Sequence, residues 1–222
     1  MGNNIQNPSH TVQFDETVTL LGHAEVRSPH LQTLVDSPAP LICADGGANT
    51  AMEFGLTPAL IVGDMDSFSG RFDGEIIHLP EQDTTDFEKC LYSVNAPLYL
   101  GFGFLGGRLD HELTALSVLV RYSDRAVILI GEQDICFCCP KQLELDLPKG
   151  ARVSIFPMSQ TEMRSTGLKW PLDDIKLSPS TRTGTSNKAN GKTVSLTLEK
   201  GEAVVILSFK HMDAVKRALT SG

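Results

Sequence analysis

The sequence lacks the marks of a membrane, exported or nucleic-acid-binding protein. No apolar run approaches the roughly 18 residues that span a bilayer, and residues 1–10 are polar, without the apolar core of a signal peptide. Positive charge is in short supply, since 19 lysines and arginines stand against 27 acidic residues, a formal net charge of −8. Repulsion opposes binding to nucleic acid or anionic membranes, so we expect neither as a partner. The missing signal core leads us to expect a cytoplasmic protein.

Cysteine is also too sparse and too unevenly placed for a disulfide framework. The number of cysteines is odd, five, and three of them fall in Cys136-Phe137-Cys138-Cys139. A zinc site would need a second ligand cluster at matching spacing, which the sequence does not contain. We therefore expect buried, reduced thiols.

The first half of the chain alternates short apolar runs with helical stretches, which predicts an α/β fold with a parallel sheet and covering helices. The 222 residues of the chain suit one large or two small domains, and we assign residues 1–147 to an N-terminal α/β domain. The expected strands are Val18–Leu21, Leu41–Ala44, Leu60–Val62, Ile76–Leu79, Leu98–Leu100 and Ala126–Ile130. The expected helices are Ala48–Phe54, Thr84–Ser93 and Asp110–Tyr122.

The second half changes period, and residues 148–222 are expected to form a small antiparallel β domain. Leu143–Leu147 alternates apolar and polar residues before the turn at Pro148-Lys149-Gly150. A short helix is expected at the end of the chain, over His211–Leu219. The expected strands of this half are Arg152–Phe156, Thr193–Leu198 and Ala203–Ser208.

Aspartates follow the predicted strands of the first half, and the carboxyl ends of parallel strands meet at one edge of a sheet. A single aspartate there is usually a helix N-cap or a turn residue, and Asp83 or Thr84 is a candidate cap. Repetition at successive strand ends weakens that explanation, and clustered carboxylates need neutralisation. Oxygen ligands without histidine or cysteine favour Mg²⁺. The aspartates concerned are Asp45, Asp64, Asp66, Asp83, Asp86 and Asp110.

Two glycine-rich segments could cradle phosphate. Asp45-Gly46-Gly47-Ala48-Asn49 opens a predicted helix, whose free amides can face an anion. Gly101–Arg108 ends in an arginine that can chelate phosphate. Its G-x-G-x-x-G spacing lies too late in the domain for a dinucleotide fingerprint, and the chain has no P-loop pattern.

Taken together, these motifs resemble the thiamine pyrophosphokinase family, from about Val18 to Phe209. The resemblance rests on four segments of the first half and two of the second. These are Ala44–Asn49, Val62–Ser67, Gln82–Cys90, Gly106–His111, Ser165–Leu172 and Thr185–Asn187. The chain departs from the family at Ala115, where asparagine is common.

The resemblance implies an enzyme that transfers the pyrophosphoryl group of ATP to the hydroxyl of thiamine, giving thiamine diphosphate and AMP. It also implies Mg²⁺, a β-sandwich as second domain, and a homodimer with active sites at the subunit interface. The implied metal ligands are Asp64, Asp66 and Asp86. On the ATP side the resemblance implies Gln82, Arg108 and Asp110. The glycine-rich segments, with the second predicted helix and the loop before it, add Gly46, Gly47, Asn49, Asp83, Thr85, Lys89, Gly106 and Gly107 as candidates. The implied thiamine contacts are Trp170, Ser186 and Asn187, and the catalytic set is Asp45, Asp64, Asp66, Asp86, Arg108 and Asp110.

Several roles stay open at the level of sequence. Lys89 fits a phosphate contact or a solvated lysine equally well, and the base that accepts the hydroxyl proton could be Asp45 or Asp110. Trp170, the single tryptophan, fits a core position on pattern alone and a thiamine-stacking position by resemblance. Pyrophosphoryl transfer to another alcohol, phosphate-ester hydrolysis and a non-catalytic nucleotide or thiamine sensor are the competing functions.

Overall fold

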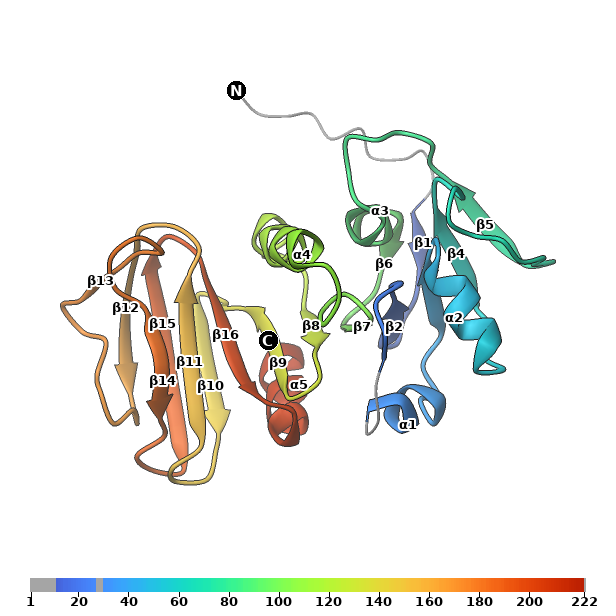
Figure 1. Cartoon of the computed structure of the whole chain (residues 1–222). Helices are drawn as coiled ribbons and strands as arrows, with labels where there is room; N and C mark the ends of the chain where they lie inside the picture. The colour runs from blue at the N-terminus through green and yellow to red at the C-terminus, as the bar shows by residue number, and fades with distance from the viewer. Residues whose placement is uncertain (1–10, 27–29, 222) are drawn as a thin grey trace.

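The computed structural model describes residues 11–26 and 30–221, so the polar segment 1–10, judged above for a signal peptide, lies outside it. A ten-stranded mixed sheet runs through the molecule (Figure 1). Six of its strands are parallel neighbours, in the order β8-β7-β2-β3-β4-β5. These are β2 (Val18–Leu21), β3 (Leu41–Ala44), β4 (Leu60–Gly63), β5 (Glu75–His78), β7 (Tyr99–Phe102) and β8 (Val127–Ile130).

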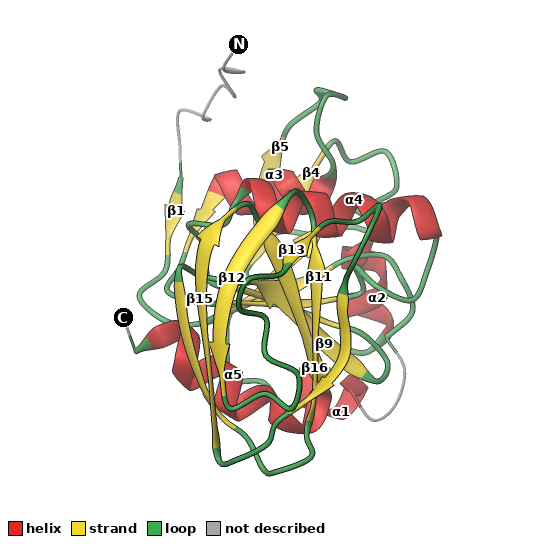
Figure 2. Cartoon of the chain, turned by 90° about the vertical axis from the view of Figure 1, so that its left-hand side faces the viewer, coloured by secondary structure: helices red, strands yellow, loops and turns green. Residues whose placement is uncertain are grey.

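The sheet continues beyond β8 through antiparallel strands in the order β9-β16-β11-β14. Their bounds are β9 (Asp134–Cys138), β16 (Ala203–Ser208), β11 (Arg152–Pro157) and β14 (Gly184–Lys188). A second sheet, antiparallel and four-stranded, packs against this end (Figure 2). It contains β10 (Gln142–Asp146), β15 (Thr193–Lys200), β12 (Thr161–Thr166) and β13 (Lys176–Leu177). A parallel pair, β1 (Val12–Gln13) with β6 (Val94–Asn95), stands apart.

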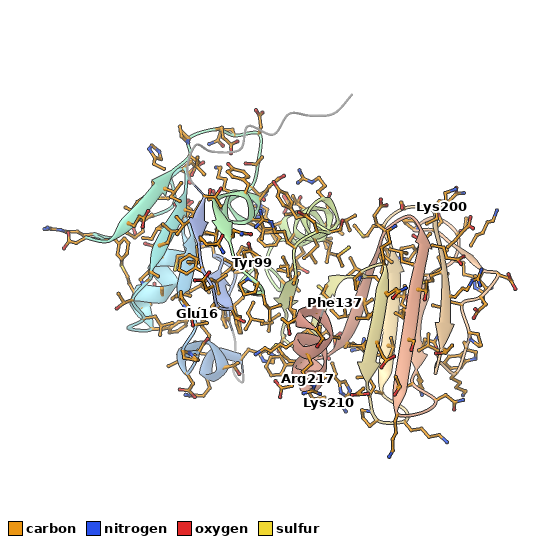
Figure 3. The ribbon with its side chains drawn as sticks, turned by 180° about the vertical axis from the view of Figure 1, so that it is seen from behind. Glu16, Tyr99, Phe137, Lys200, Lys210 and Arg217 are labelled. Carbon is orange, nitrogen blue, oxygen red and sulfur yellow. The ribbon has the colours of Figure 1, made fainter. Side chains whose placement is uncertain are left out.

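Side chains along the parallel strands point alternately to the two faces of the large sheet, and helices pack on both faces. Leu20 and Ile42 pack with α3 (Asp86–Ser93) and α4 (Leu109–Arg121), whereas Leu21 packs with residues of the other helices. Buried aromatic residues such as Tyr99 and Phe137 fill the interior (Figure 3). The other helices are α1 (His30–Val35), α2 (Gly47–Glu53), η1 (Phe209–His211) and α5 (Met212–Thr220).

The expected α/β architecture with a parallel-rich sheet and an antiparallel sheet is confirmed. The structure also shows that the large sheet is continuous through β8 and β9, across the two halves of the chain. The boundary drawn between residues 147 and 148 falls after β10, and among the described strands the partner of β10 is β15 of the second half. The helix cap at the start of α3 is Thr85, not Asp83 or Thr84.

All five cysteines are free, and four of them are buried, in line with the expectation of reduced thiols. Burial raises the pKa of Cys43 and of Cys136 to about 12. Among the described residues, no helix is both long and apolar enough to cross a membrane.

Candidate active site at the carboxyl edge of the sheet

Three carboxylates meet where β3 and β4 end. Asp45 follows β3 directly, and Asp64 and Asp66 follow β4. One oxygen of each lies within 4.8 Å of the others, so the three side chains together could hold a cation. Asp45 is buried, Asp64 is half-buried and Asp66 is exposed, so the cluster opens towards solvent.

Asp45 also fastens the loop after β4. Its two carboxylate oxygens accept hydrogen bonds from the main-chain amides of Ser67, at 3.0 Å, and Phe68, at 3.1 Å. Asp45 is 1% exposed and has a φ of 40°, a left-handed conformation that aspartate tolerates better than most residues. Burial raises the pKa of Asp45, and the Ser67 amide partly offsets this effect.

Asn49, predicted on the ATP side, makes three hydrogen bonds to the same loop. Its Nδ2 donates to the carbonyl of Ser67 at 2.8 Å, and its Oδ1 accepts from the amide and hydroxyl of Ser69. With Asp45, this side chain fixes the backbone that carries Asp64 and Asp66.

Two further residues predicted at the site contact the carboxylate of Asp64. Gln82 donates from Nε2 to Asp64 Oδ2 at 2.6 Å, and Lys89 Nζ lies 3.8 Å from the same oxygen. The hydrogen bond from Gln82, together with the positive charge of Lys89, lowers the pKa of Asp64. Asp64 is therefore a carboxylate at neutral pH, ready to bind a cation.

Asp86 and Lys89 lie on the first turn and a half of α3. Asp86 is not one of the three clustered carboxylates. Its Oδ1 lies 3.3 Å from Nζ of Lys89, which bridges Asp86 and Asp64. The side chain of Lys89 is only 2% exposed, so it is not a solvated lysine. Burial raises the pKa of Asp86, and Lys89 opposes that shift.

Two glycines keep the elements of this edge close together. A Cβ on Gly47 would lie 2.1 Å from the carbonyl oxygen of Leu21, so only glycine lets α2 begin beside β2. A Cβ on Gly63 would lie 2.7 Å from Cβ of Asp45 and 3.2 Å from Oδ1 of Asp86. Gly63 thus allows both Asp45 and Asp86 to lie close to the end of β4.

The second glycine-rich segment leads into α4 and presents its charged residues to solvent. Arg108 Nη2 lies 2.5 Å from Oδ2 of Asp110, and both side chains are more than 60% exposed. This pairing lowers the pKa of Asp110. The amide of Gly106 donates to Glu112 at 3.0 Å, while Gly107 lies exposed in the same loop.

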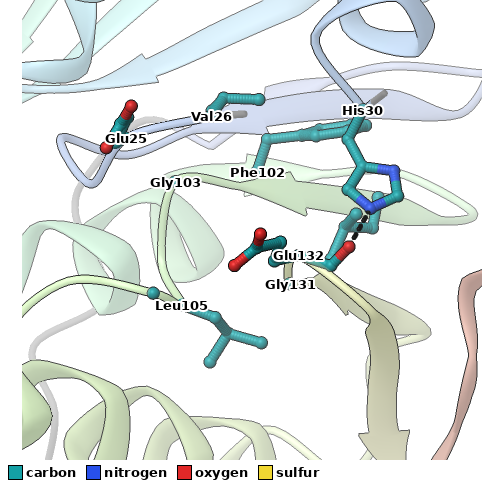
Figure 4. A pocket seen from close by; sticks show the side chains of 10 residues that line it. Glu25, Val26, His30, Phe102, Gly103, Leu105, Gly131 and Glu132 are labelled. Carbon is teal, nitrogen blue, oxygen red and sulfur yellow. Dashed lines mark hydrogen bonds between the residues drawn. The ribbon is translucent and has the colours of Figure 1, made fainter. Parts of the chain in front are cut away.

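A small pocket lies beside this loop, at the ends of β7 and β8 (Figure 4). Phe102, Gly103 and Leu105 line it, and His30 Nε2 is 2.7 Å from the carbonyl oxygen of Glu132 at its far side. Its volume of about 70 Å³ is well below the roughly 300 Å³ at which ligand pockets begin. The pocket suits a few water molecules rather than a nucleotide.

Trp170 is not a core residue, because half of its surface is exposed. Its main chain is held by Asn187, which accepts from the Trp170 amide at 3.2 Å and donates to the Trp170 carbonyl at 2.6 Å. Nζ of Lys169 lies 4.6 Å from the centre of the indole ring, a cation–π contact. Ser186, exposed next to Asn187 on β14, has a φ of 62°.

The structure does not bring these thiamine-side residues to the carboxylate cluster. Asn187 belongs to β14 at one end of the large sheet, and Asp64 follows β4 near the other end (Figure 1). Eight strand spacings separate β14 from β4, or roughly 38 Å at about 4.8 Å per spacing.

Sequence reasoning missed two polar contacts around α3. Glu81 accepts hydrogen bonds from the loop before the helix and from Tyr92 within it. Glu88 is 1% exposed and pairs with Arg121 of α4 through two hydrogen bonds, at 2.5 and 2.7 Å. The partners are 11 and 33 residues apart in the chain, so no local motif could have indicated either contact.

Comparison with known proteins gives two matching domain families. Residues 31–130 match "Thiamin pyrophosphokinase, catalytic domain", and residues 139–202 match "Thiamin pyrophosphokinase, vitamin B1 binding domain". A curated relative, thiamine pyrophosphokinase 1 of Oryza sativa subsp. japonica, is 31% identical over 77% of this chain and 80% of its own length. Thiamin pyrophosphokinase 1 of Caenorhabditis elegans is 27% identical over 81% of this chain and 83% of its own.

Solved structures agree on the fold. The crystal structure of thiamin pyrophosphokinase from Geobacillus thermodenitrificans superimposes with a TM-score of 0.74, at 25% identity, over 86% of this chain and 97% of that one. The yeast enzyme, 16% identical, superimposes with a TM-score of 0.71 over 99% of this chain and 96% of its own, which supports the fold alone.

Proposed function

The chain belongs to the thiamine pyrophosphokinase family and is a diphosphotransferase, and we propose that its carboxylate cluster is where ATP gives up its pyrophosphoryl group to thiamine. The observation that carries the proposal is the convergence of Asp45, Asp64 and Asp66 within 4.8 Å. Such a cluster suits a reaction whose main demand is neutralisation of phosphate charge.

The residues present fit a magnesium ion. They offer oxygen atoms alone, from two strand ends, and the exposed Asp66 leaves room for phosphate oxygens. Asp64 and Asp66 would hold the ion, with Asp86 completing the set from α3, as the family resemblance implies. When bound, the ion supplies positive charge to the β- and γ-phosphates of ATP.

The chain's own residues hold ATP and position the reacting groups. Arg108 is exposed and exchanges its contact with Asp110 for a phosphate, while buried Lys89 keeps a fixed positive charge at the cluster. The hydroxyl oxygen of thiamine attacks the β-phosphorus, and the bond from that phosphorus to the oxygen bridging it to the α-phosphate breaks, releasing AMP. Asp45 is buried and anchors the loop through both carboxylate oxygens, so we assign the hydroxyl proton to Asp110, which is exposed and is released when Arg108 turns to the phosphate.

In this proposal the phosphates meet main-chain amides at Gly46, Gly47 and Gly107. Gln82, Asp83 and Thr85 belong to the loop before α3, which reaches the cluster through the bond from Gln82 to Asp64. Trp170 supplies the surface on which thiamine stacks. Its ring is half-exposed and already attracts the Lys169 cation, and thiamine carries a positive charge that suits the same face. Ser186 and Asn187 flank it.

The protein works as a homodimer in this proposal. One copy cannot offer Asp64 and Trp170 to the same thiamine, because eight strand spacings separate their parts of the sheet. A second copy related by two-fold symmetry would bring its Trp170 to the cluster of the first, and the reverse. Exposed Leu109 and Leu113, at 70% and 58%, give α4 an apolar stripe for such a contact.

Product analysis tests the function directly. With ATP, Mg²⁺ and thiamine, we expect thiamine diphosphate and AMP in equal amounts. Release of ADP with thiamine monophosphate would show single phosphoryl transfer instead, and release of AMP without any dependence on thiamine would show hydrolysis. Either result would overturn the proposal.

A further inference from the structure

A single carboxylate organises the loop that connects β5 to α3. Glu81 accepts hydrogen bonds from the main-chain amides of Asp83, at 2.9 Å, and Thr84, at 3.1 Å. It also accepts from the hydroxyl of Thr84 and from the hydroxyl of Tyr92, the latter at 2.7 Å. Four donors on one carboxylate leave the loop little freedom.

Tyr92 ties this arrangement to the helix. It lies in the last turn of α3 and is only 6% exposed. Burial raises the pKa of Tyr92, so its hydroxyl stays protonated and donates. Burial alone would raise the pKa of Glu81 as well, but the bonds from Thr84, Tyr92 and the amides lower it overall. Glu81 is therefore ionised, and the bond from Tyr92 is charge-assisted.

The clamped loop leads to three groups at the carboxylate cluster and directly positions two of them, Gln82 and Asp86. Gln82 follows Glu81 directly and donates to Asp64 at 2.6 Å. The loop ends at Asp86, and one turn later Lys89 contacts both Asp86 and Asp64. A shift of the loop would move Gln82 away from Asp64, while the helix, held by its own packing, would keep Lys89 in place.

We propose that Glu81 and Tyr92 are positioning residues, which hold the loop so that Gln82 and Asp86 present the cluster to a divalent cation and the phosphates of ATP. The inference rests on the proposed function for its consequence in catalysis. Neither residue reaches the cluster itself, so both act through Gln82 and Asp86. Partners of this kind orient metal ligands, and their loss costs about 10-fold or more in metal affinity.

The experiment compares Tyr92→Phe and Glu81→Gln with a matched control. Tyr122 follows α4, and its hydroxyl lies next to Glu88 of α3, the helix that also carries Tyr92. Tyr122→Phe removes that hydroxyl and leaves every bond to Glu81 intact. Mn²⁺ affinity is measured by electron paramagnetic resonance without substrates. Hydrogen exchange of the main-chain amides of Asp83 and Thr84 is measured in the metal-free protein. Initial rates give kcat and the KM values for Mg-ATP and thiamine.

We expect about 10-fold weaker Mn²⁺ binding in Tyr92→Phe, faster exchange of the Thr84 amide, and a raised KM for Mg-ATP with an unchanged KM for thiamine. Tyr122→Phe should match the wild type. The double variant Glu81→Gln/Tyr92→Phe should lose little beyond Glu81→Gln, because the two residues act together.

Unchanged Mn²⁺ affinity and amide exchange in Tyr92→Phe, with or without a lower melting temperature, would overturn the proposal and leave the contact a structural one. If Glu81→Gln fails to fold, Tyr92→Phe still decides. Failure of the proposed function would give a different result. The wild-type protein would form no AMP, while Tyr92→Phe would still bind Mn²⁺ more weakly than the wild type.

Discussion

The main-chain amide of Ser67 donates a hydrogen bond of 3.0 Å to Oδ2 of Asp45. This bond joins the residue after β3 to the loop after β4, and so fixes the backbone of the two aspartates that precede Ser67. One buried carboxylate thus sets the geometry of two others, which an isolated loop of this length could not do for itself.

Replacing Asp45 by asparagine should disturb this loop. Asparagine tolerates the positive φ at this position. In the wild type both carboxylate oxygens accept from main-chain N–H groups, and in asparagine an NH₂ group replaces one of these oxygens and faces an N–H donor. We expect a loss of about 1–2 kcal/mol in the free energy of unfolding, measured by urea denaturation, together with weaker cation binding. Full stability combined with full activity would contradict the anchoring role.

Replacing Asp66 by asparagine should do the opposite, lowering turnover while sparing stability. Asp66 is exposed, and its Oδ1, which accepts from the Ser67 hydroxyl at 2.8 Å, is retained in asparagine. Loss of a carboxylate leaves phosphate charge uncompensated, so we expect turnover to fall by about 10²-fold or more. Removal of divalent cations with a chelator should abolish wild-type turnover, and activity that survives it would rule out the metal site.

Trp170→Ala should weaken thiamine binding and leave ATP binding unchanged. Stacked aromatics contribute ~1–3 kcal/mol, so we expect the KM for thiamine to rise roughly 5- to 150-fold. The half-exposed ring predicts little change in melting temperature. Lys169→Gln is the control, since removing the cation 4.6 Å from the ring should not weaken thiamine binding. An unchanged KM with a lower melting temperature would make Trp170 a packing residue.

Mixing two impaired variants tests the shared active site, with thiamine kept well below the raised KM of Trp170→Ala so that neither variant alone shows much activity. If each site takes its cluster from one copy and its Trp170 from the other, a dimer of Asp66→Asn with Trp170→Ala has one intact site. After unfolding and refolding of an equal mixture, activity should recover to about one quarter of wild type. Light scattering should give twice the 24.1 kDa of one chain, and a monomeric mass would contradict the proposal.

The cysteines should resist alkylation in the native protein at pH 8. Thiolate is the reactive form, and burial raises the pKa of Cys138 to about 11 and of Cys139 to about 12. At pH 8 a thiol with a pKa near 11 is ionised in about one molecule per thousand. Mass spectrometry should show Cys138, the one half-buried thiol, labelled first and slowly, and all five labelled in urea.

Much of the fold is readable from the sequence, because buried parallel strands are short apolar runs and surface helices repeat at 3.6 residues. Val18–Leu21 and Leu41–Ala44 were predicted with the bounds that the structure has. β14 was missed because Gly184–Lys188 contains glycine and polar residues, and its strand conformation depends on pairing with β11. Pairing between distant segments also makes the sheet continuous, and no local pattern reports it.

The site is readable in part, for a related reason. Aspartates at strand ends predict a shared edge, and three of them do meet there. Their separate roles depend on burial, which the sequence does not report. Asp45 is buried and anchors the loop, whereas Asp66 is exposed and available to a cation. Asn49 lies in a recognisable motif, but its contacts with Ser67 and Ser69 come from a loop 18 residues away, so spacing alone could not assign them.

The position of β16 bears on how the chain folds during synthesis. Residues 203–208 are synthesised after both of their partner strands, yet they occupy the place between β9 and β11 inside the large sheet. Until then β9 and β11 present unpaired edges, which are prone to aggregation. The nascent chain therefore depends on protection of those edges, and a frameshift or stop codon shortly before residue 203 would yield an insoluble product although every residue of the carboxylate cluster is present.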